Sequence, residues 1–101
     1  MIRHIVMWRV SGRTDAECNQ ARMKVKQAFE GLRGCVPGLR HLEVGLDVSD
    51  VNYACDAVLV TEFESKAALD AYATHPEHLR VRAELAGIRT ERHQVDYILE
   101  R

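Results

Sequence analysis

The segment IRHIVMWRV, residues 2–10, decides the fold of this chain. It is rich in β-branched and aromatic residues, which favour an extended strand. Its apolar side chains occupy both alternating positions, because Val6 and Trp8 share one face while Ile5 and Met7 share the other. A strand that is apolar on both faces is typical of a sheet that is covered on both sides.

The remaining sequence predicts three more strands, which complete the sheet, and helices that would cover one of its two faces. Apolar residues recur at helical spacing after Thr14, and residues 39–49 alternate apolar with polar side chains. Ser65 is placed to cap a short helix, and Pro76 suits the first turn of another. In chain order, the predicted elements are a strand at 2–10, a helix from Thr14 to about Leu32, strands at 39–49 and 56–63, helices at 65–73 and from Pro76 to about Ala86, and a strand at 91–99.

This β-α-β-β-α-β order predicts an α+β fold of the ferredoxin-like type, with a four-stranded antiparallel sheet and helices on one face. The other face would present Ile5, Met7, His93, Val95 and Tyr97. So many apolar side chains together exceed the patch that a soluble monomer usually exposes. A second copy of the sheet is therefore expected to cover them, so that two sheets form a dimeric α/β barrel in a homodimer.

Composition narrows the class of protein further. A chain of 101 residues is expected to be one domain, residues 1–101, and its 47% hydrophobic content suits a folded globule. The net charge of −1 comes from interleaved acids and bases, so neither nucleic acid nor a membrane is expected as a partner. Three cysteines without C-x-x-C spacing favour free thiols, and the charged N-terminus resembles neither a signal peptide nor a membrane span. A cytoplasmic location is the resulting expectation.

The segment YATHPEH, residues 72–78, gathers side chains that carry proton chemistry. Thr74 and Glu77 have the spacing of a capping box, so the segment certainly starts a helix. A histidine in the first helical turn, here His78, has its pKa lowered by the helix dipole and can act as a neutral base. Tyr72 is expected to approach it within hydrogen-bond reach across the joint between the helices. Catalytic and structural interpretations of the pair both remain open.

Other chemistries find less support. His75 and His78 are three residues apart, but His75 precedes Pro76 and no third ligand follows at a suitable spacing, so no metal site is predicted. No cysteine has a visible histidine or cationic neighbour that would activate a thiol nucleophile. The chain has no dinucleotide loop, P-loop or Ser-His-Asp arrangement, and no cofactor is expected.

Four segments of the chain resemble a known family. They are IRHIVMWRV, PGLRHLEVGLDVS, LVTEFESKAALDAYATHPEHLRV and, near the end, VDY. They resemble, in this order, the stress-responsive A/B barrel domain (Dabb) family, a branch of the dimeric α+β barrels. The resemblance implies the barrel fold and a dimer. Most members have no assigned reaction, and one plant member is a cyclase that closes a linear polyketide thioester by intramolecular aldol condensation.

The resemblance to this cyclase implies roles for particular residues. Its tyrosine and histidine acid–base pair matches Tyr72 and His78, and a first-strand histidine of its site matches His4. Some plant relatives also hold a structural magnesium on main-chain carbonyls after the first helix, here near residues 33–39.

The pocket around this pair departs from the cyclase. A pocket tyrosine of the cyclase aligns with Phe29, and a pocket histidine aligns with Ala57. Two apolar pocket residues align with Arg92 and Gln94. The cyclase's own substrate is therefore not expected, and Arg92 would favour an acidic or thioester-linked compound if it faced the cavity.

These observations leave two functions of different classes. The first is cofactor-independent acid–base chemistry, such as an aldol, enolisation, cyclase-like or lyase-like step, on a small carbonyl or thioester compound in a cavity of each protomer. Tyr72 would hydrogen-bond the carbonyl oxygen and His78 would take the proton; the residues expected to line the cavity are His4, Trp8, Phe29, Leu59 and Arg92. The alternative is a non-catalytic, stress-associated dimer that binds a small apolar ligand or a protein partner. Haem- or oxygen-linked monooxygenase chemistry, as in sister families of the barrel, is a third possibility.

Overall fold

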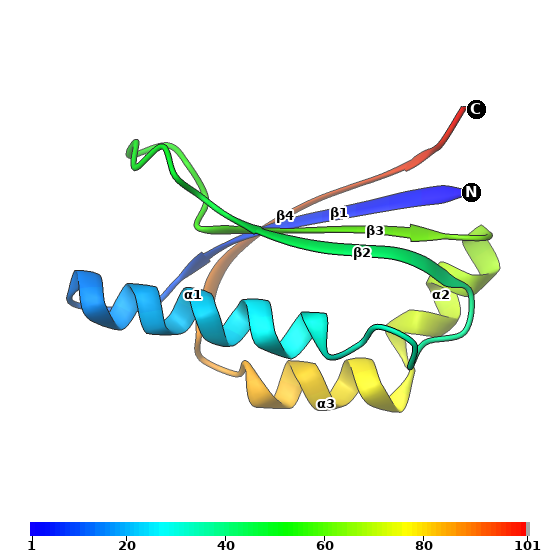
Figure 1. Cartoon of the computed structure of the whole chain (residues 1–101), viewed down its shortest axis with the longest axis horizontal. Coiled ribbons are helices and arrows are strands. Elements are labelled where there is room, and N and C mark those ends of the chain that lie inside the picture. The colour runs from blue at the N-terminus through cyan, green and yellow to red at the C-terminus, as the bar shows by residue number, and fades with distance from the viewer. Residues whose placement is uncertain (101) are drawn as a thin grey trace.

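In a computed structural model, which describes residues 1–100, one four-stranded sheet is covered by three helices on a single side (Figure 1). The elements in chain order are β1 (Ile2–Val10), α1 (Asp15–Glu30), β2 (Leu39–Leu46), β3 (Ala57–Phe63), α2 (Lys66–Ala73), α3 (Pro76–Glu84) and β4 (Arg89–Ile98). The strand order is β2-β3-β1-β4, and all neighbouring strands are antiparallel. The predicted ferredoxin-like fold is confirmed.

Several predicted element boundaries differ from the structure, and the clearest case is a turn that interrupts the hydrophobic pattern. The strand predicted at 39–49 ends at Leu46, and Val48 is 96% exposed. The Asp47 carboxylate accepts hydrogen bonds from the Ser49 hydroxyl at 2.9 Å and the Asp50 N–H at 3.0 Å, which bends the chain away from the sheet. Likewise α1 ends at Glu30 rather than Leu32, α3 ends at Glu84 rather than Ala86, β3 begins at Ala57 rather than 56, and β4 covers Arg89–Ile98 rather than 91–99.

The break between α2 and α3 is set by Pro76. A residue that precedes proline is disfavoured in a helix, and His75 has an extended backbone with φ −63° and ψ 137°. The predicted capping box was wrong, because Thr74 is the C-cap of α2 and His75 is the N-cap of α3. The Nδ1 atom of His75 accepts the hydrogen bond of the Glu77 N–H at 3.1 Å. This joint orients the end of α2 against the start of α3.

His75→Ala is expected to lower the free energy of unfolding by about 1 kcal/mol, because α3 loses its N-cap. His75→Asn should restore most of the loss, since an asparagine side chain also accepts this hydrogen bond. Denaturant unfolding measures both variants, with Thr74→Ala as the matched control. A larger effect from Thr74→Ala than from His75→Ala would reinstate the capping box.

The core lies between the sheet and the helices. Val6 and Trp8 of β1 point into it, and each is at most 2% exposed. The Trp8 ring stacks on Phe29 of α1 with ring centroids 4.9 Å apart. Because β1 lies between β3 and β4, every second residue of β1 forms a central row beneath the helices. His4 belongs to this row.

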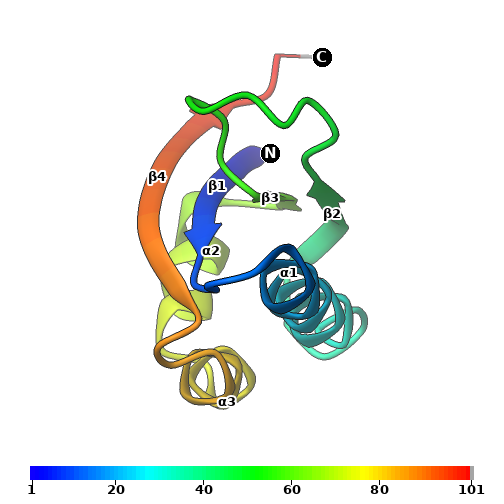
Figure 2. The same ribbon diagram turned by 90° about the vertical axis from the view of Figure 1, so that its left-hand side faces the viewer.

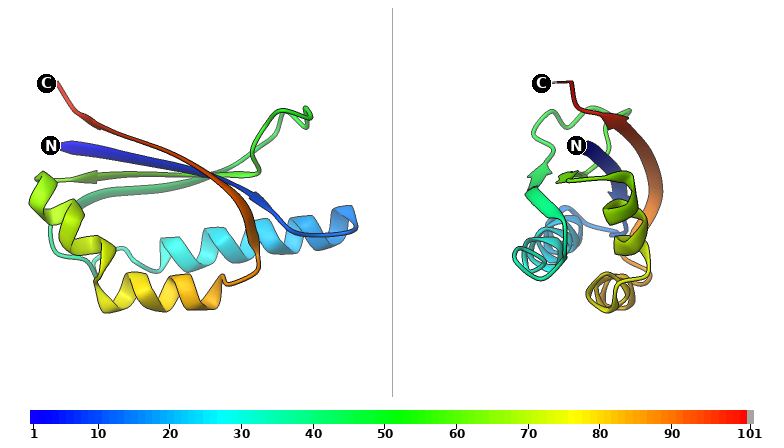
Figure 3. Two further views of the ribbon diagram at one scale, coloured as in Figure 1. Left: turned by 180° about the vertical axis from the view of Figure 1, so that it is seen from behind. Right: turned by 90° about the vertical axis from the view of Figure 1, so that its right-hand side faces the viewer.

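The C-terminal part of the chain returns to the sheet beside β1. Figure 3 shows β4 running back from the end of α3 along the edge of the sheet. Its register places Arg92 opposite Trp8 and Asp96 opposite His4. Side chains of β4 are thereby brought next to the central row of β1.

The second face of the sheet carries no helix in the described chain, as the end-on view in Figure 2 shows. Ile5 pairs with Val60 and Val95, so the three side chains share this face. It also carries Met7, His93 and Tyr97, as predicted, together with Val58. Val95 is 59% exposed and Met7 is 37% exposed. An apolar surface therefore remains open on the single chain.

The longest helix, α1, has 16 residues. Within residues 1–100, no helix combines the length and the apolar character needed to cross a membrane. Cys18, Cys35 and Cys55 are free cysteines.

Candidate functional site

A cavity of about 500 Å³ lies between the helices and the sheet. It is lined by His4, Val6, Trp8, Phe29, Leu59, Tyr72, Ala73, His78, Arg82, Arg89, Thr90, Glu91 and Arg92. Every residue predicted for the site is in this lining. The helix joint supplies Tyr72 and His78, β1 supplies His4 and Trp8, and β4 supplies Arg92.

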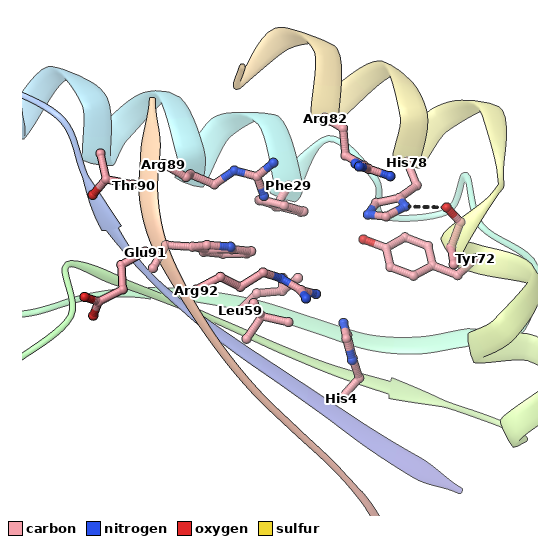
Figure 4. A pocket seen from close by; sticks show the side chains of 13 residues that line it. His4, Phe29, Leu59, Tyr72, His78, Arg82, Arg89, Thr90, Glu91 and Arg92 are labelled. Carbon is pink, nitrogen blue, oxygen red and sulfur yellow. Dashed lines mark hydrogen bonds between the residues drawn. The ribbon is translucent and has the colours of Figure 1, made fainter. Parts of the chain in front are cut away.

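Tyr72 and His78 meet through their ring faces. The ring centroids are 4.2 Å apart with an interplanar angle of 34°. Nδ1 of His78 lies 3.0 Å from the Ala73 carbonyl oxygen (Figure 4). A carbonyl oxygen only accepts, so Nδ1 carries the hydrogen and Nε2 of the neutral ring keeps its lone pair. The expected hydrogen bond between the two side chains is not formed, since the Ala73 carbonyl holds the His78 ring over the Tyr72 ring at a tilt.

The pKa values of the pair are shifted in opposite directions. Burial lowers the pKa of His78 below its usual 6.5, and the nearby charges of Arg82 and Arg89 lower it further, although the Ala73 hydrogen bond opposes them. Burial raises the pKa of Tyr72 to about 12. At neutral pH the cavity therefore contains a neutral imidazole that can accept a proton and a phenol that can donate a hydrogen bond.

His4 is held by a carboxylate that sequence analysis did not find. Its Nδ1 atom lies 2.5 Å from Oδ1 of Asp96, and Oδ2 of Asp96 accepts a hydrogen bond from Gln94 at 2.9 Å. The His4 ring points towards Tyr72, with ring centroids 6.3 Å apart (Figure 4). The Asp96 carboxylate fixes the orientation of the His4 ring. The only signal in the sequence was that the first and last strands could pair, and their register was not predictable.

Sequence analysis also missed two of the three arginines in the lining. Arg82 comes from α3, Arg89 begins β4, and both point towards the cavity with Arg92 (Figure 4). The Arg89 guanidinium carbon lies 5.1 Å from the centre of the Trp8 ring. Arg82 and Arg89 reach the same cavity because the turn that joins α3 to β4 brings a helix side chain and a strand side chain together.

In residues 1–100, the potential metal ligands that come together are not those expected from residues 72–78, although one of them, Glu91, lies in the cavity lining. His75 caps α3 while His78 bonds the Ala73 carbonyl, so the two histidines are used separately. Donor atoms of Cys55, Glu91 and His93 lie within 4.8 Å of one another. His93 is on the uncovered face of the sheet, away from the rings of Tyr72 and His78. The magnesium position expected near residues 33–39 stays a prediction.

Fold and cavity together define a ferredoxin-like protein with a cavity between its helices and its sheet, where a tyrosine and a histidine ring are in contact. The model of one protein family, described as Stress responsive A/B Barrel Domain, matches residues 2–99. The chain belongs to this family, and the resemblance inferred from its sequence is confirmed.

Solved structures with the same fold cover nearly all of the chain. A dimeric protein of unknown function from Bacteroides fragilis is 29% identical, with a TM-score of 0.85 over 97% of this chain and 95% of its own. A dimeric ferredoxin-like protein from Thermobifida fusca is 24% identical, with a TM-score of 0.81 over 97% and 90%. The hydroxynitrile lyase of Passiflora edulis is 17% identical, with a TM-score of 0.79 over 98% and 93%. No curated protein matches the chain significantly.

Proposed function

We propose that the cavity catalyses cofactor-independent acid–base chemistry on a small carbonyl compound. Nε2 of His78 removes a proton from the carbon beside the carbonyl, and the Tyr72 hydroxyl donates a hydrogen bond to the carbonyl oxygen. The observation that carries this proposal is the arrangement of His78: one ring nitrogen is tied to Ala73, and the ring packs against a protonated phenol in a cavity.

The proposed step is enolate formation. The C–H bond breaks, its proton moves to Nε2 of His78, and its electron pair forms the enolate, whose negative charge is on the carbonyl oxygen. Tyr72 stabilises that charge through its hydroxyl. The enolate then attacks a second carbonyl in a cyclase-like reaction or expels a leaving group in a lyase-like one. Base and oxyanion donor are both side chains of this chain.

Two further observations support the proposal over a purely structural role. A structural role predicts that both rings are packed shut, whereas Tyr72 and His78 line a cavity of about 500 Å³, a volume within the usual range for small-molecule sites. The Passiflora edulis protein of the same fold is a hydroxynitrile lyase, so this architecture is compatible with a lyase.

Exchange of α-protons for deuterium tests the first step directly, because it requires only enolate formation. Wild-type protein is incubated in D₂O with β-keto thioesters and with lactones, and NMR follows the loss of the α-proton signal. Exchange faster than in buffer supports the proposal. Ligand binding without exchange or turnover across the whole panel would instead support the non-catalytic alternative.

The pH dependence of this exchange follows from the two shifted pKa values. The unprotonated form of His78 increases as pH rises, so the rate should rise through an apparent pKa below 6.5. The rate should then stay level, because Tyr72 loses its proton only near its pKa of about 12. Initial rates measured over a series of pH values show both the rise and the level region of this profile. A midpoint above the usual histidine pKa, or a decline before roughly pH 10, would contradict these assignments.

We further propose that a second copy of the chain covers the open face of the sheet. Val95 and Ile5 lie side by side on that face, and Val58, Val60, Met7 and Tyr97 extend the apolar surface. Two such sheets packed about a two-fold axis remove both surfaces from water and close a barrel. The solved relatives from Bacteroides fragilis and Thermobifida fusca are both described as dimeric.

A further inference from the structure

Three guanidinium groups reach the cavity without a carboxylate partner. Arg82, Arg89 and Arg92 line the cavity, yet none of their guanidinium groups forms an ion pair or hydrogen bond with any of residues 1–100. The one carboxylate in the lining belongs to Glu91, which already binds Arg9 at 3.2 Å and His93 at 2.9 Å. The positive charge in this cavity is therefore not neutralised by the chain itself.

Arg89 shows this imbalance most clearly. Its side chain is half-buried over two aromatic rings, 5.1 Å from the centre of Trp8 and 5.6 Å from that of Phe29. Burial lowers the pKa of Arg89, and the like charges of Arg92 and Arg82 lower it further. Like charges that converge on a partly desolvated site are destabilising unless an anion joins them.

A buried hydrogen-bond donor lies in the same wall. Trp8 is 2% exposed and lines the cavity, and its indole N–H has no hydrogen-bond partner in residues 1–100. A buried N–H without an acceptor is uncommon in folded proteins, so it is a reason to look for an acceptor among ligands. Unpaired guanidinium groups and an unpaired indole N–H have the same requirement, a ligand that accepts hydrogen bonds.

This concentration of positive charge is a property of the cavity, since the whole chain has a net charge of −1. Figure 4 shows where the charges lie relative to the proposed chemistry. Arg89 lies at the end of the cavity near Phe29, Tyr72 and His78 lie at the opposite end, and the Arg92 side chain extends between them. A ligand that reaches both ends needs a carbonyl group at one end and an anionic group at the other.

We infer that the cavity takes a small carbonyl compound that carries a carboxylate or phosphate group, bound by Arg89 and Arg92 with its apolar part against Trp8 and Phe29. Arginine suits this role because its planar guanidinium donates two parallel hydrogen bonds to either oxyanion. Arg82 adds positive charge beside His78. The position of the carbonyl group in this inference rests on the proposed function. The preference for an anion does not, because it is a property of binding alone.

Binding of matched probes tests the inference without requiring turnover. Isothermal titration calorimetry compares 4-acetylbenzoate, 4-acetylphenyl phosphate and the neutral 4-acetylbenzamide, which share a ketone and a ring and differ in the charged group. At least one anionic probe should bind about ten- to hundredfold more tightly than the amide, and the difference should shrink as sodium chloride is raised. The stronger of the two anions distinguishes a carboxylate site from a phosphate site.

Arginine variants locate the effect. Arg89→Met and Arg92→Met should each lose most of the preference for the anion, with little change in the weak binding of the amide. Arg80→Met is the matched control, because Arg80 lies on α3 outside the cavity lining and pairs with Glu77 and Glu84. Circular dichroism confirms that each variant is folded.

The inference and the proposed function can fail separately. His78→Ala should keep the anion preference although it loses exchange. Wild-type protein that shows the anion preference but no exchange would refute only the proposed reaction. Equal affinity of wild-type protein for the two anions and the amide would overturn the inference, whatever the exchange assay shows. An anion preference that no salt concentration reduces, or that Arg80→Met abolishes while Arg89→Met and Arg92→Met retain it, would overturn it as well.

Discussion

His78→Ala is expected to lower the rate of α-proton exchange about 10²- to 10⁴-fold, because the cavity loses its proposed general base. The Tyr72 phenol is no replacement, because it stays protonated up to a pKa of about 12. The other imidazole in the lining belongs to His4, whose Nδ1 is engaged with Asp96. Initial rates in D₂O, measured at saturating probe, separate this loss from a change in binding.

His41→Ala is the matched control, since His41 is exposed on β2 and lies outside the cavity lining. It should retain the wild-type rate. His78→Gln is a second variant that keeps a polar side chain of similar size against Tyr72, so that loss of packing is not mistaken for loss of the base. If His78→Ala exchanged at the wild-type rate while His4→Ala did not, the base would be His4.

Val95→Asp is expected to leave little soluble, folded dimer. Val95 lies opposite Ile5 on the open face, where the proposed partner sheet would bury it. A carboxylate in that interface would be desolvated without a partner, which costs several kcal/mol, comparable to the whole stability of a small domain. Light scattering after size-exclusion chromatography, together with the soluble yield, measures the effect.

Val48→Asp makes the same chemical change away from the sheet, where Val48 is 96% exposed. This control should remain folded and dimeric. Well-folded monomer from Val95→Asp, or a monomeric wild-type chain at micromolar concentration, would show that the open face is not the interface.

The sequence by itself determined the order of the strands and helices and the two faces of the sheet. Alternation in a strand and helical spacing are local patterns, so Val6 and Trp8 could be assigned to one face of β1 and Ile5 and Met7 to the other. Local pattern was less reliable at the ends of elements. The apolar alternation continued to Val48, but the Asp47 side chain ended β2 earlier.

A residue of the cavity could be predicted only where two arguments agreed. One was the face of the strand or helix on which the residue lies, and the other was the resemblance to the family. His4, Trp8 and Phe29 were placed in this way, and each lines the cavity. Local spacing did not indicate how two neighbours would meet. The extended backbone of His75 before Pro76, and the hydrogen bond from His78 to the Ala73 carbonyl, decide that the rings of Tyr72 and His78 meet at a tilt.

Only the tertiary structure decided which distant side chains share the site. His4 and Asp96 are 92 positions apart, and they meet because the register of β1 and β4 sets them opposite each other. Arg82 and Arg89 come together because the chain turns between α3 and β4. A one-residue change of register would turn Asp96 to the opposite face of the sheet while leaving every local pattern unchanged. The charge and hydrogen bonding of the cavity therefore depend on long-range geometry that residue spacing does not encode.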